Sequence, residues 1–133
     1  MDEVAPTFEH QTGKCVPIRD MLSRIGDKWT IVVLGVLGKE PLRFKALHRA
    51  IDGISERVLV VSLRNLERDG LVQRTVYPAV PPRVEYEVTA RGHSLREALT
   101  HVAAWVHSNQ DGIDESRRSF DQRTAAEASL TKT

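Results

Sequence analysis

Hydrophobic positions recur every three to four residues over four segments in the first half of the chain, which is the spacing of one buried helix face. The pattern predicts helices over residues 17–26, 28–37, 44–50 and 55–69. Asp27 and Ser55 are suited to cap the second and fourth of these helices, and Gly38 is suited to end the second.

After the fourth helix the hydrophobic spacing changes to alternation, which is typical of half-buried strands. Two runs alternate in this way, VQRTV at 72–76 and RVEYEV at 83–88, and a loop with three prolines joins them. They predict a β-hairpin with a stiff tip. A short extended piece at 41–43 is expected before the third helix.

A last helix is predicted to begin after Thr89, whose hydroxyl can cap it. Its apolar positions recur at helical spacing as far as Val106. We expect the helix to run to about Asp111, with an interruption at Gly112, and a frayed polar tail over residues 122–133.

The order helix, helix, short strand, helix, helix, hairpin, helix predicts a winged helix-turn-helix. The expected fold class is mainly α with a small antiparallel β-hairpin (α+β), and the long C-terminal helix would serve dimerisation. We divide the chain into a flexible arm (1–14), the winged helix-turn-helix domain with its dimerisation helices (15–111), and a C-terminal helical extension with a frayed tail (112–133).

Composition restricts the class of protein. The 133 residues suffice for one core, and the hydrophobic (41%) and charged (28%) contents are those of a globular protein. No apolar run approaches the roughly 20 residues that span a bilayer, the N-terminus has no secretory signal, and the single cysteine excludes an internal disulfide. We therefore expect a cytoplasmic, nucleoid-associated protein without a membrane partner.

Charge adds a weak indication of a nucleic-acid partner. The net charge is only +1, but residues 39–93 carry ten Lys/Arg against seven Asp/Glu. At 100° per residue, Leu59, Leu63 and Leu66 share the buried side of the fourth helix, and three arginines lie opposite. Two interpretations follow: a solvated face with ordinary ion pairs, or a helix that enters the major groove of DNA. The adjacent hairpin, whose tip has no acidic residue, favours DNA.

These segments also resemble a known family. The resemblance covers Cys15 to Trp105 and is carried by IGDKWT (25–30), PLRFKALHRAI (41–51), GISERVL (53–59), LRNLERDGLVQRTVYPAVPPRVEYEVTARG (63–92) and the late Trp105. They are similar to the HxlR-type regulators, bacterial dimeric winged-helix transcription factors related to the MarR group. The resemblance implies operator binding by a homodimer, usually repression of neighbouring genes, and in some members redox sensing by an N-terminal cysteine.

The chain departs from the family pattern at two places. Val60 and Val61 stand where the family usually has small polar or glutamine-like residues, so base recognition is expected to differ. Val16 separates Cys15 from Pro17, whereas the family cysteine often directly precedes the proline. This shift puts the redox role in doubt.

The predicted DNA contacts come from the fourth helix, the hairpin and the start of the third helix. They are Ser55, Glu56, Arg57, Val60, Val61, Arg64, Arg68, Arg43, Lys45, Arg74 and Arg83. Arg57 or Arg64 would bind guanine bidentately, Val61 would contact thymine methyl groups, and the others would meet phosphate or a minor groove. Two alternatives stay open: Glu56 binds cytosine or only stabilises the helix start, and Arg74 pairs with Glu85 or Glu87 across the hairpin.

A symmetric dimer on a near-palindromic operator is expected, because one such module buries little DNA surface. The predicted dimer interface consists of Ile18, Leu22, Leu95, Leu99, Val102, Trp105 and Val106. The alternative is that this stripe packs on the core of its own monomer.

Cys15 is the candidate redox-sensing residue. Lys14 and the following helix start both favour its thiolate, the form that reacts with oxidants and electrophiles. The alternative is an unreactive thiol, with regulation by a small-molecule effector or none.

Other classes of chemistry find no support. The five histidines lack metal-ligand spacing, and the chain has no Ser/His/Asp set, paired carboxylates or glycine-rich phosphate loop. We expect no enzyme activity, no metal and no cofactor. A winged helix that serves only protein–protein assembly is the remaining alternative to a DNA-binding regulator.

Overall fold

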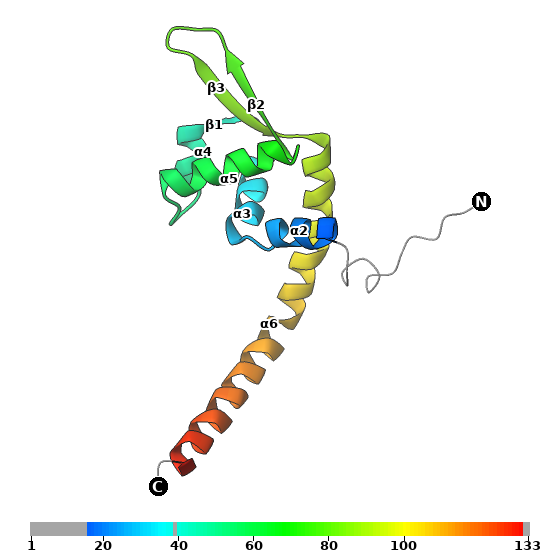
Figure 1. The fold of residues 1–133 in the computed structure, drawn as a ribbon, viewed down its shortest axis with the longest axis vertical. Helices are drawn as coiled ribbons and strands as arrows, with labels where there is room; N and C mark the ends of the chain where they lie inside the picture. The colour runs from blue at the N-terminus through cyan, green and yellow to red at the C-terminus, as the bar shows by residue number, and fades with distance from the viewer. Residues whose placement is uncertain (1–15, 39, 132–133) are drawn as a thin grey trace, which may run out of the picture. The chain divides into compact units, whose positions relative to one another are not determined.

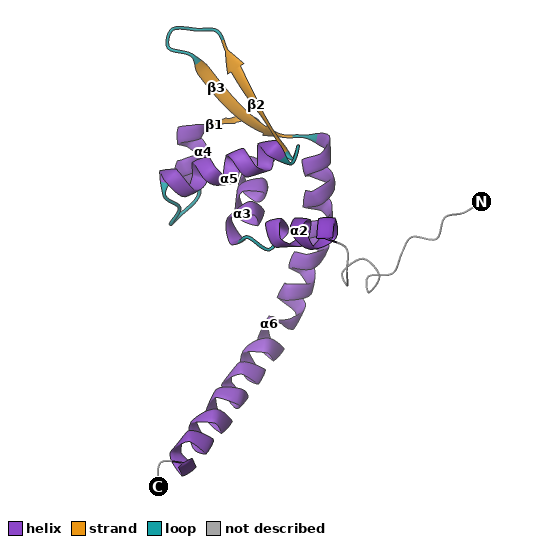
Figure 2. Cartoon of the chain, in the orientation of Figure 1, coloured by secondary structure: helices purple, strands orange, loops and turns teal. Residues whose placement is uncertain are grey.

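The computed structural model describes residues 16–38 and 40–131. The predicted arm at 1–14 and Cys15 lie outside the described residues. The elements follow in the order α2 (Val16–Ile25), α3 (Lys28–Leu37), β1 (Leu42–Arg43), α4 (Phe44–Ala50), α5 (Glu56–Arg68), β2 (Val72–Tyr77), β3 (Arg83–Val88) and α6 (Ala90–Thr131). The described part has several helices and one small sheet, whose strands β2 and β3 project beyond α4 and α5 (Figures 1 and 2).

Side-chain caps start three of the helices where the sequence predicts them. The backbone N–H of Trp29 donates to Asp27 at the start of α3 (2.9 Å), and the backbone N–H of Val58 donates to the Ser55 hydroxyl in α5 (3.1 Å). Before α6, the Thr89 hydroxyl accepts from the backbone N–H of Gly92 (3.1 Å). Each cap gives an otherwise unpaired N–H a partner, which fixes where the helix begins.

The sheet is antiparallel in the order β1-β3-β2. The predicted hairpin is confirmed, and β1 adds a third strand by pairing Leu42 with Tyr86. Val72 faces Val88 at the inner end of the hairpin, and Tyr77 faces Arg83 at the outer end. Beyond β1, strands β2 and β3 continue as a two-stranded arm, the wing (Figure 1).

One core joins the helices to the base of the wing. Its buried hydrophobic side chains are Val33, Leu34, Leu37, Leu47, Ile51, Ile54, Leu59, Leu63, Leu66, Leu71, Val72 and Val88. Helix α5 contributes its predicted leucine stripe, so its opposite side is left facing outward.

The last helix is longer than expected. It runs without interruption to Thr131, so the predicted break at Gly112 and the frayed tail at 122–133 are wrong for every described residue. One glycine costs a helix only about 1 kcal/mol, and local hydrogen bonds such as Gln110 Nε2 to Asp114 Oδ1 (2.9 Å) support the polar stretch around it.

The chain divides into two units, one up to Arg96 and one from Glu97 onward. The second unit consists of the remainder of α6. Over residues 16–38 and 40–131, no helix combines the length and apolar content needed to cross a membrane, α6 included.

Candidate nucleic-acid interface

The outward side of α5 is a basic surface with valines in it. Arg57, Arg64 and Arg68 are exposed, and Val61 keeps 51% of its surface accessible. A valine so exposed contributes little to the core, so the predicted orientation of the helix is confirmed.

The guanidinium groups of this surface are accessible to a ligand. Arg57, Arg64, Arg68 and Arg74 have no side-chain hydrogen bond or ion pair with any residue that the structure describes. A long cationic side chain without an internal partner remains free to meet an anionic ligand. Of the alternative interpretation, a solvated face with ordinary ion pairs, the ion pairs are absent among the described residues, while the face itself is exposed to solvent.

The turn before α5 is held by His48 of α4. Its Nε2 lies 2.9 Å from the backbone oxygen of Ile54, and since a carbonyl only accepts, the ring nitrogen donates. The His48 ring also stacks on Phe44, with ring centroids 6.2 Å apart. These contacts fix the direction in which Ser55 and the first turn of α5 are presented.

The pleat of the wing places Arg74 on a different face from Glu85 and Glu87, which share their face with Arg83. Arg74 is directly opposite Tyr86 in the register, so both lie on the same face of the sheet. Glu85 and Glu87, at odd offsets from Tyr86, lie on the other face. The alternative of a cross-strand ion pair between Arg74 and Glu85 or Glu87 is thereby wrong.

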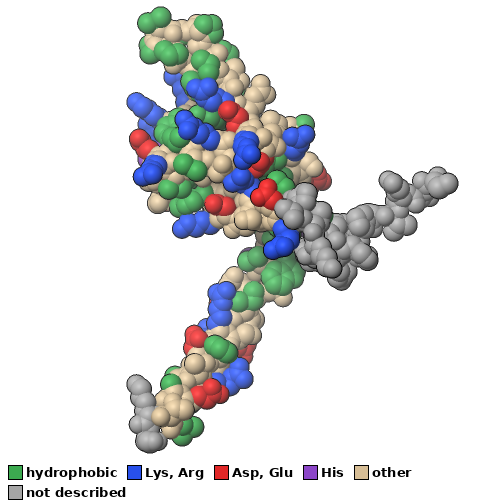
Figure 3. Space-filling view, viewed as in Figure 1, with side chains coloured by type: hydrophobic (Ala, Val, Ile, Leu, Met, Phe, Trp, Pro, Cys, Tyr) green, Lys and Arg blue, Asp and Glu red, His purple; other side chains and the backbone are tan. Residues whose placement is uncertain are grey.

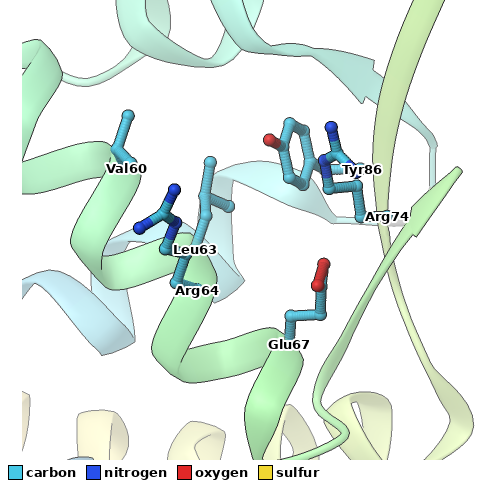
Figure 4. Close-up of a pocket in the computed structure, with 6 residues that line it drawn as sticks. All are labelled: Val60, Leu63, Arg64, Glu67, Arg74 and Tyr86. Carbon is cyan, nitrogen blue, oxygen red and sulfur yellow. The ribbon is translucent and has the colours of Figure 1, made fainter. Parts of the chain in front are cut away.

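A pocket of about 330 Å³ lies between α5 and this face of the sheet. Helix α5 lines it with Val60, Leu63, Arg64 and Glu67, and the strands line it with Arg74 and Tyr86. Figure 4 shows the Tyr86 hydroxyl directed toward α5, with Arg74 beside its ring. Val60, Arg64 and Glu67 thus form the flank of α5 nearest the wing.

The end of the wing carries a cation held against an aromatic ring. Arg83 lies over the ring of Tyr77, 4.4 Å from its centroid, and its Nε is 3.5 Å from Glu85. The loop beyond it is exposed, with Val80 fully accessible. Arg83 is therefore already partly neutralised, unlike Arg74.

The other predicted contacts are at the start of α4. Arg43 pairs with Glu85 in the strand register, and both Arg43 and Lys45 are exposed. Over α4, α5 and the base of the wing, basic side chains are more prominent than acidic ones, and the tip of the wing has neither (Figure 3).

The predicted dimer-interface residues are in part accessible in each unit. In α2, Leu22 is exposed and Ile18 is half-buried; in the first turns of α6, Leu95 is half-buried. In the second unit Leu99 is half-buried, and Val102 (53%), Trp105 (59%) and Val106 (40%) are exposed. The exposed members are more apolar surface than a solvated helix face needs.

Sequence reasoning missed Tyr86, Leu63 and Glu67 as parts of the interface. A signal for Tyr86 was present, because strand alternation places it on the same face as Val84 and Val88. The pairing that sets it against Arg74 joins residues on different strands and depends on the register, which the pattern of one strand does not fix.

The chain is similar to known proteins in sequence and in fold. The model of the HxlR-like helix-turn-helix family matches residues 24–114. The HTH-type transcriptional regulator YtfH of Escherichia coli K12, itself uncharacterized, is 39% identical over 93 residues, which cover 70% of this chain and 74% of YtfH.

Two solved structures show the same architecture. A transcriptional regulator of the MarR family from Enterococcus faecalis V583 has a TM-score of 0.65 at 38% identity, covering 77% of this chain and 93% of its own. The redox regulator HypR in its reduced form has a TM-score of 0.67 at 35% identity, covering 74% of this chain and 98% of HypR.

Proposed function

Because this chain belongs to the HxlR-like helix-turn-helix family of DNA-binding transcriptional regulators, we propose that it is a sequence-specific repressor. In this proposal it acts in the cytoplasm, at the nucleoid, as a homodimer on a near-palindromic operator. Its ligand is duplex DNA, and it is not an enzyme.

One observation carries the proposal: four arginines of α5 and the wing are exposed and have no partner among the described residues. Three of them stand beside exposed valines on α5, whose start is held by the Ser55 cap and by the contact of His48 with the backbone oxygen of Ile54. Such a surface has the charge for phosphate and the apolar atoms for thymine methyl groups.

The helix supplies the base contacts. Arg57, near the start of α5, and Arg64, two turns further along the same face, bind guanine O6 and N7, and Val61 and Val60 contact thymine methyl groups. Ser55 and Glu56 enter the groove with them, although the Ser55 hydroxyl already serves as the cap. Glu56 accepts from cytosine.

The remaining basic residues bind the backbone. Arg68, at the last turn of α5, meets phosphate, as do Arg43 and Lys45 at the start of α4. Arg74 and Arg83 of the wing bind phosphate or reach the minor groove. Arg83 contributes less, because Glu85 lies 3.5 Å from it.

Two copies are needed for tight binding, since one module buries little DNA surface. The accessible apolar side chains of α2 and α6, among them Leu22 and Trp105, supply the interface. A twofold axis then places the second α5 about one helical turn of DNA away, which gives the operator its symmetry.

Cys15 is the proposed sensor of oxidants or electrophiles. It directly precedes the start of α2 at Val16, where a helix N-terminus favours the thiolate. The structural relative HypR is a redox regulator. With one cysteine in each chain, the switch uses an intersubunit disulfide, a mixed disulfide or direct alkylation.

Selection of binding sites from random duplexes, followed by fluorescence anisotropy at several salt concentrations, tests DNA recognition. We expect a palindromic consensus and an affinity that falls steeply with salt. A protein that selects no sequence and ignores DNA at low salt is instead a protein-interaction module.

The redox proposal needs its own test. Binding to the selected site is measured before and after diamide or a quinone, with Cys15→Ser as the matched control. We expect the treatment to change the affinity of the wild type only. If the DNA affinity of the wild type did not change, the protein would be a regulator without this redox switch.

A further inference from the structure

The pocket between α5 and the wing has the composition of a site for a charged group. Four of its six lining side chains are polar or ionisable, whereas pockets for drug-like molecules are predominantly apolar. Arg64 and Arg74 bring two positive charges and Glu67 one negative charge, so the pocket is net cationic. Tyr86 adds a hydroxyl, which can donate a hydrogen bond.

We propose that this pocket seats one phosphodiester group of the DNA strand that borders the major groove, and that Tyr86 and Arg74 bind it. This inference rests on the proposed DNA-binding function and assigns to it a site and a residue, Tyr86, that sequence reasoning did not provide.

The dimensions of DNA place a phosphate there. A helix with its side chains is about 10–12 Å wide, and the major groove is about 12 Å wide. With α5 in the groove, the backbone at the groove edge must pass beside the helix. On the wing side of α5, the space beside the helix is this pocket (Figure 4).

The sheet presents both proposed ligands on one face. Arg74 and Tyr86 are register partners on β2 and β3, and Arg74 has no ion pair among the described residues. Tyr86 is on the central strand, held between Leu42 of β1 and Arg74 of β2. The side chains of Leu42 and Arg74 are therefore its neighbours on the same face of the sheet, one on each side.

A substitution at Glu67 can show whether the pocket holds a phosphate or a base. Its carboxylate lines the same space and would repel a phosphate, whereas it would accept a hydrogen bond from a cytosine or adenine amino group. Removing the charge should therefore tighten binding on every sequence if the occupant is a phosphate.

The test uses the full-length protein and its selected duplex in anisotropy titrations. Arg74→Gln should weaken binding about 10- to 100-fold, as for a lost charge-assisted hydrogen bond. It should also reduce the salt slope by about two, because a dimer has two pockets and each phosphate contact contributes about 0.9. Tyr86→Phe should weaken binding several-fold and Glu67→Gln should strengthen it.

Matched controls remove the same groups elsewhere. Arg117→Gln makes the same charge change on exposed α6, and Tyr77→Phe removes a hydroxyl on the opposite face of the wing. Neither should alter affinity by more than about twofold. Circular dichroism and thermal melting are used to check that every variant is folded.

A neutral methylphosphonate, placed one phosphate at a time along the duplex, locates the site. At one position in each half-site, the methylphosphonate should lower the DNA affinity of the wild type. It should not lower that of Arg74→Gln, because that variant has already lost the contact. No such position, or Tyr86→Phe and Arg74→Gln binding as the wild type does, would overturn the phosphate assignment. The assignment would also be overturned if the pocket bound inorganic phosphate saturably while Tyr86→Phe and Arg74→Gln kept the DNA affinity of the wild type. A wild type that binds no duplex at all would instead refute the proposed function.

Discussion

Arg24 of α2 and Asp69 at the end of α5 are 45 positions apart in the sequence, and Arg24 Nε donates to Asp69 Oδ2 at 2.9 Å. Both side chains are largely buried, with 26% and 18% of their surface exposed. The ion pair ties the first described helix to the last turn of the helix that we propose reads DNA. The ion pair thus links α2 directly to the end of α5, in addition to the packing of both helices on α3.

Loss of this ion pair should destabilise the fold. We expect Arg24→Ala to lower the free energy of unfolding by about 1–2 kcal/mol, because Asp69 is left partly buried without its counterion. Urea denaturation measures the change. A double-mutant cycle with Asp69→Ala should give a coupling above about 0.5 kcal/mol; additive effects would mean that the pair contributes nothing. Arg68→Ala, at an exposed site, is the control for stability.

Arg64→Ala should change which sequences are bound as well as how tightly. A bidentate contact with guanine is worth about 1–3 kcal/mol of discrimination, so the variant should bind the consensus and a version with that guanine replaced almost equally. Repeating the site selection with the variant measures this. Equal weakening on all duplexes would assign Arg64 to the backbone instead.

Val102→Glu should produce a monomer. A charge in an apolar interface between subunits is left without a partner, and its desolvation opposes association. Sedimentation velocity at micromolar concentration measures the change, and DNA affinity should fall with it. Ala104→Glu introduces the same charge on the opposite side of α6 and should remain a dimer. If Val102→Glu sediments as the wild type does, the interface lies elsewhere.

Two glycines of the same helix should respond to alanine with opposite signs. A Cβ on Gly92 would collide with the Leu71 backbone oxygen and with Val88, so Gly92→Ala should lower the free energy of unfolding by about 2–3 kcal/mol. A Cβ on Gly112 meets nothing within 4 Å, so Gly112→Ala should stabilise the helix by about 0.5–1 kcal/mol. Thermal melting followed by circular dichroism compares the two; a loss of stability in Gly112→Ala would contradict the open surroundings of that position.

Local features of the fold were predictable because their causes lie within a few residues. Asp27, Ser55 and Thr89 each accept from a backbone N–H two or three positions ahead. The leucine stripe of α5 likewise follows from the helical period alone, and so does the outward position of its arginines.

The features that the sequence did not predict depend on distant residues or on sums of weak effects. The pairing of Leu42 with Tyr86 joins segments more than forty residues apart, and a two-residue strand has no periodicity. The continuation of α6 through Gly112 results from many small propensities and hydrogen bonds, none of which is decisive alone. The Tyr86 pocket exists only once helix and sheet are packed together.

The proposed DNA contacts Arg74 and Tyr86 share one face of the wing and Glu85 and Glu87 share the other, so DNA binding would depend on strand alignment. If β3 moved by one position along β2, every β3 side chain would change faces. Glu85 and Glu87 would then face α5, Tyr86 would turn away, and the side facing DNA would repel it. Substitutions in the loop from Pro78 to Pro82 should therefore be tolerated more readily than an insertion or deletion that shifts the register, which would invert the polarity of this surface and also turn Val88 out of the core.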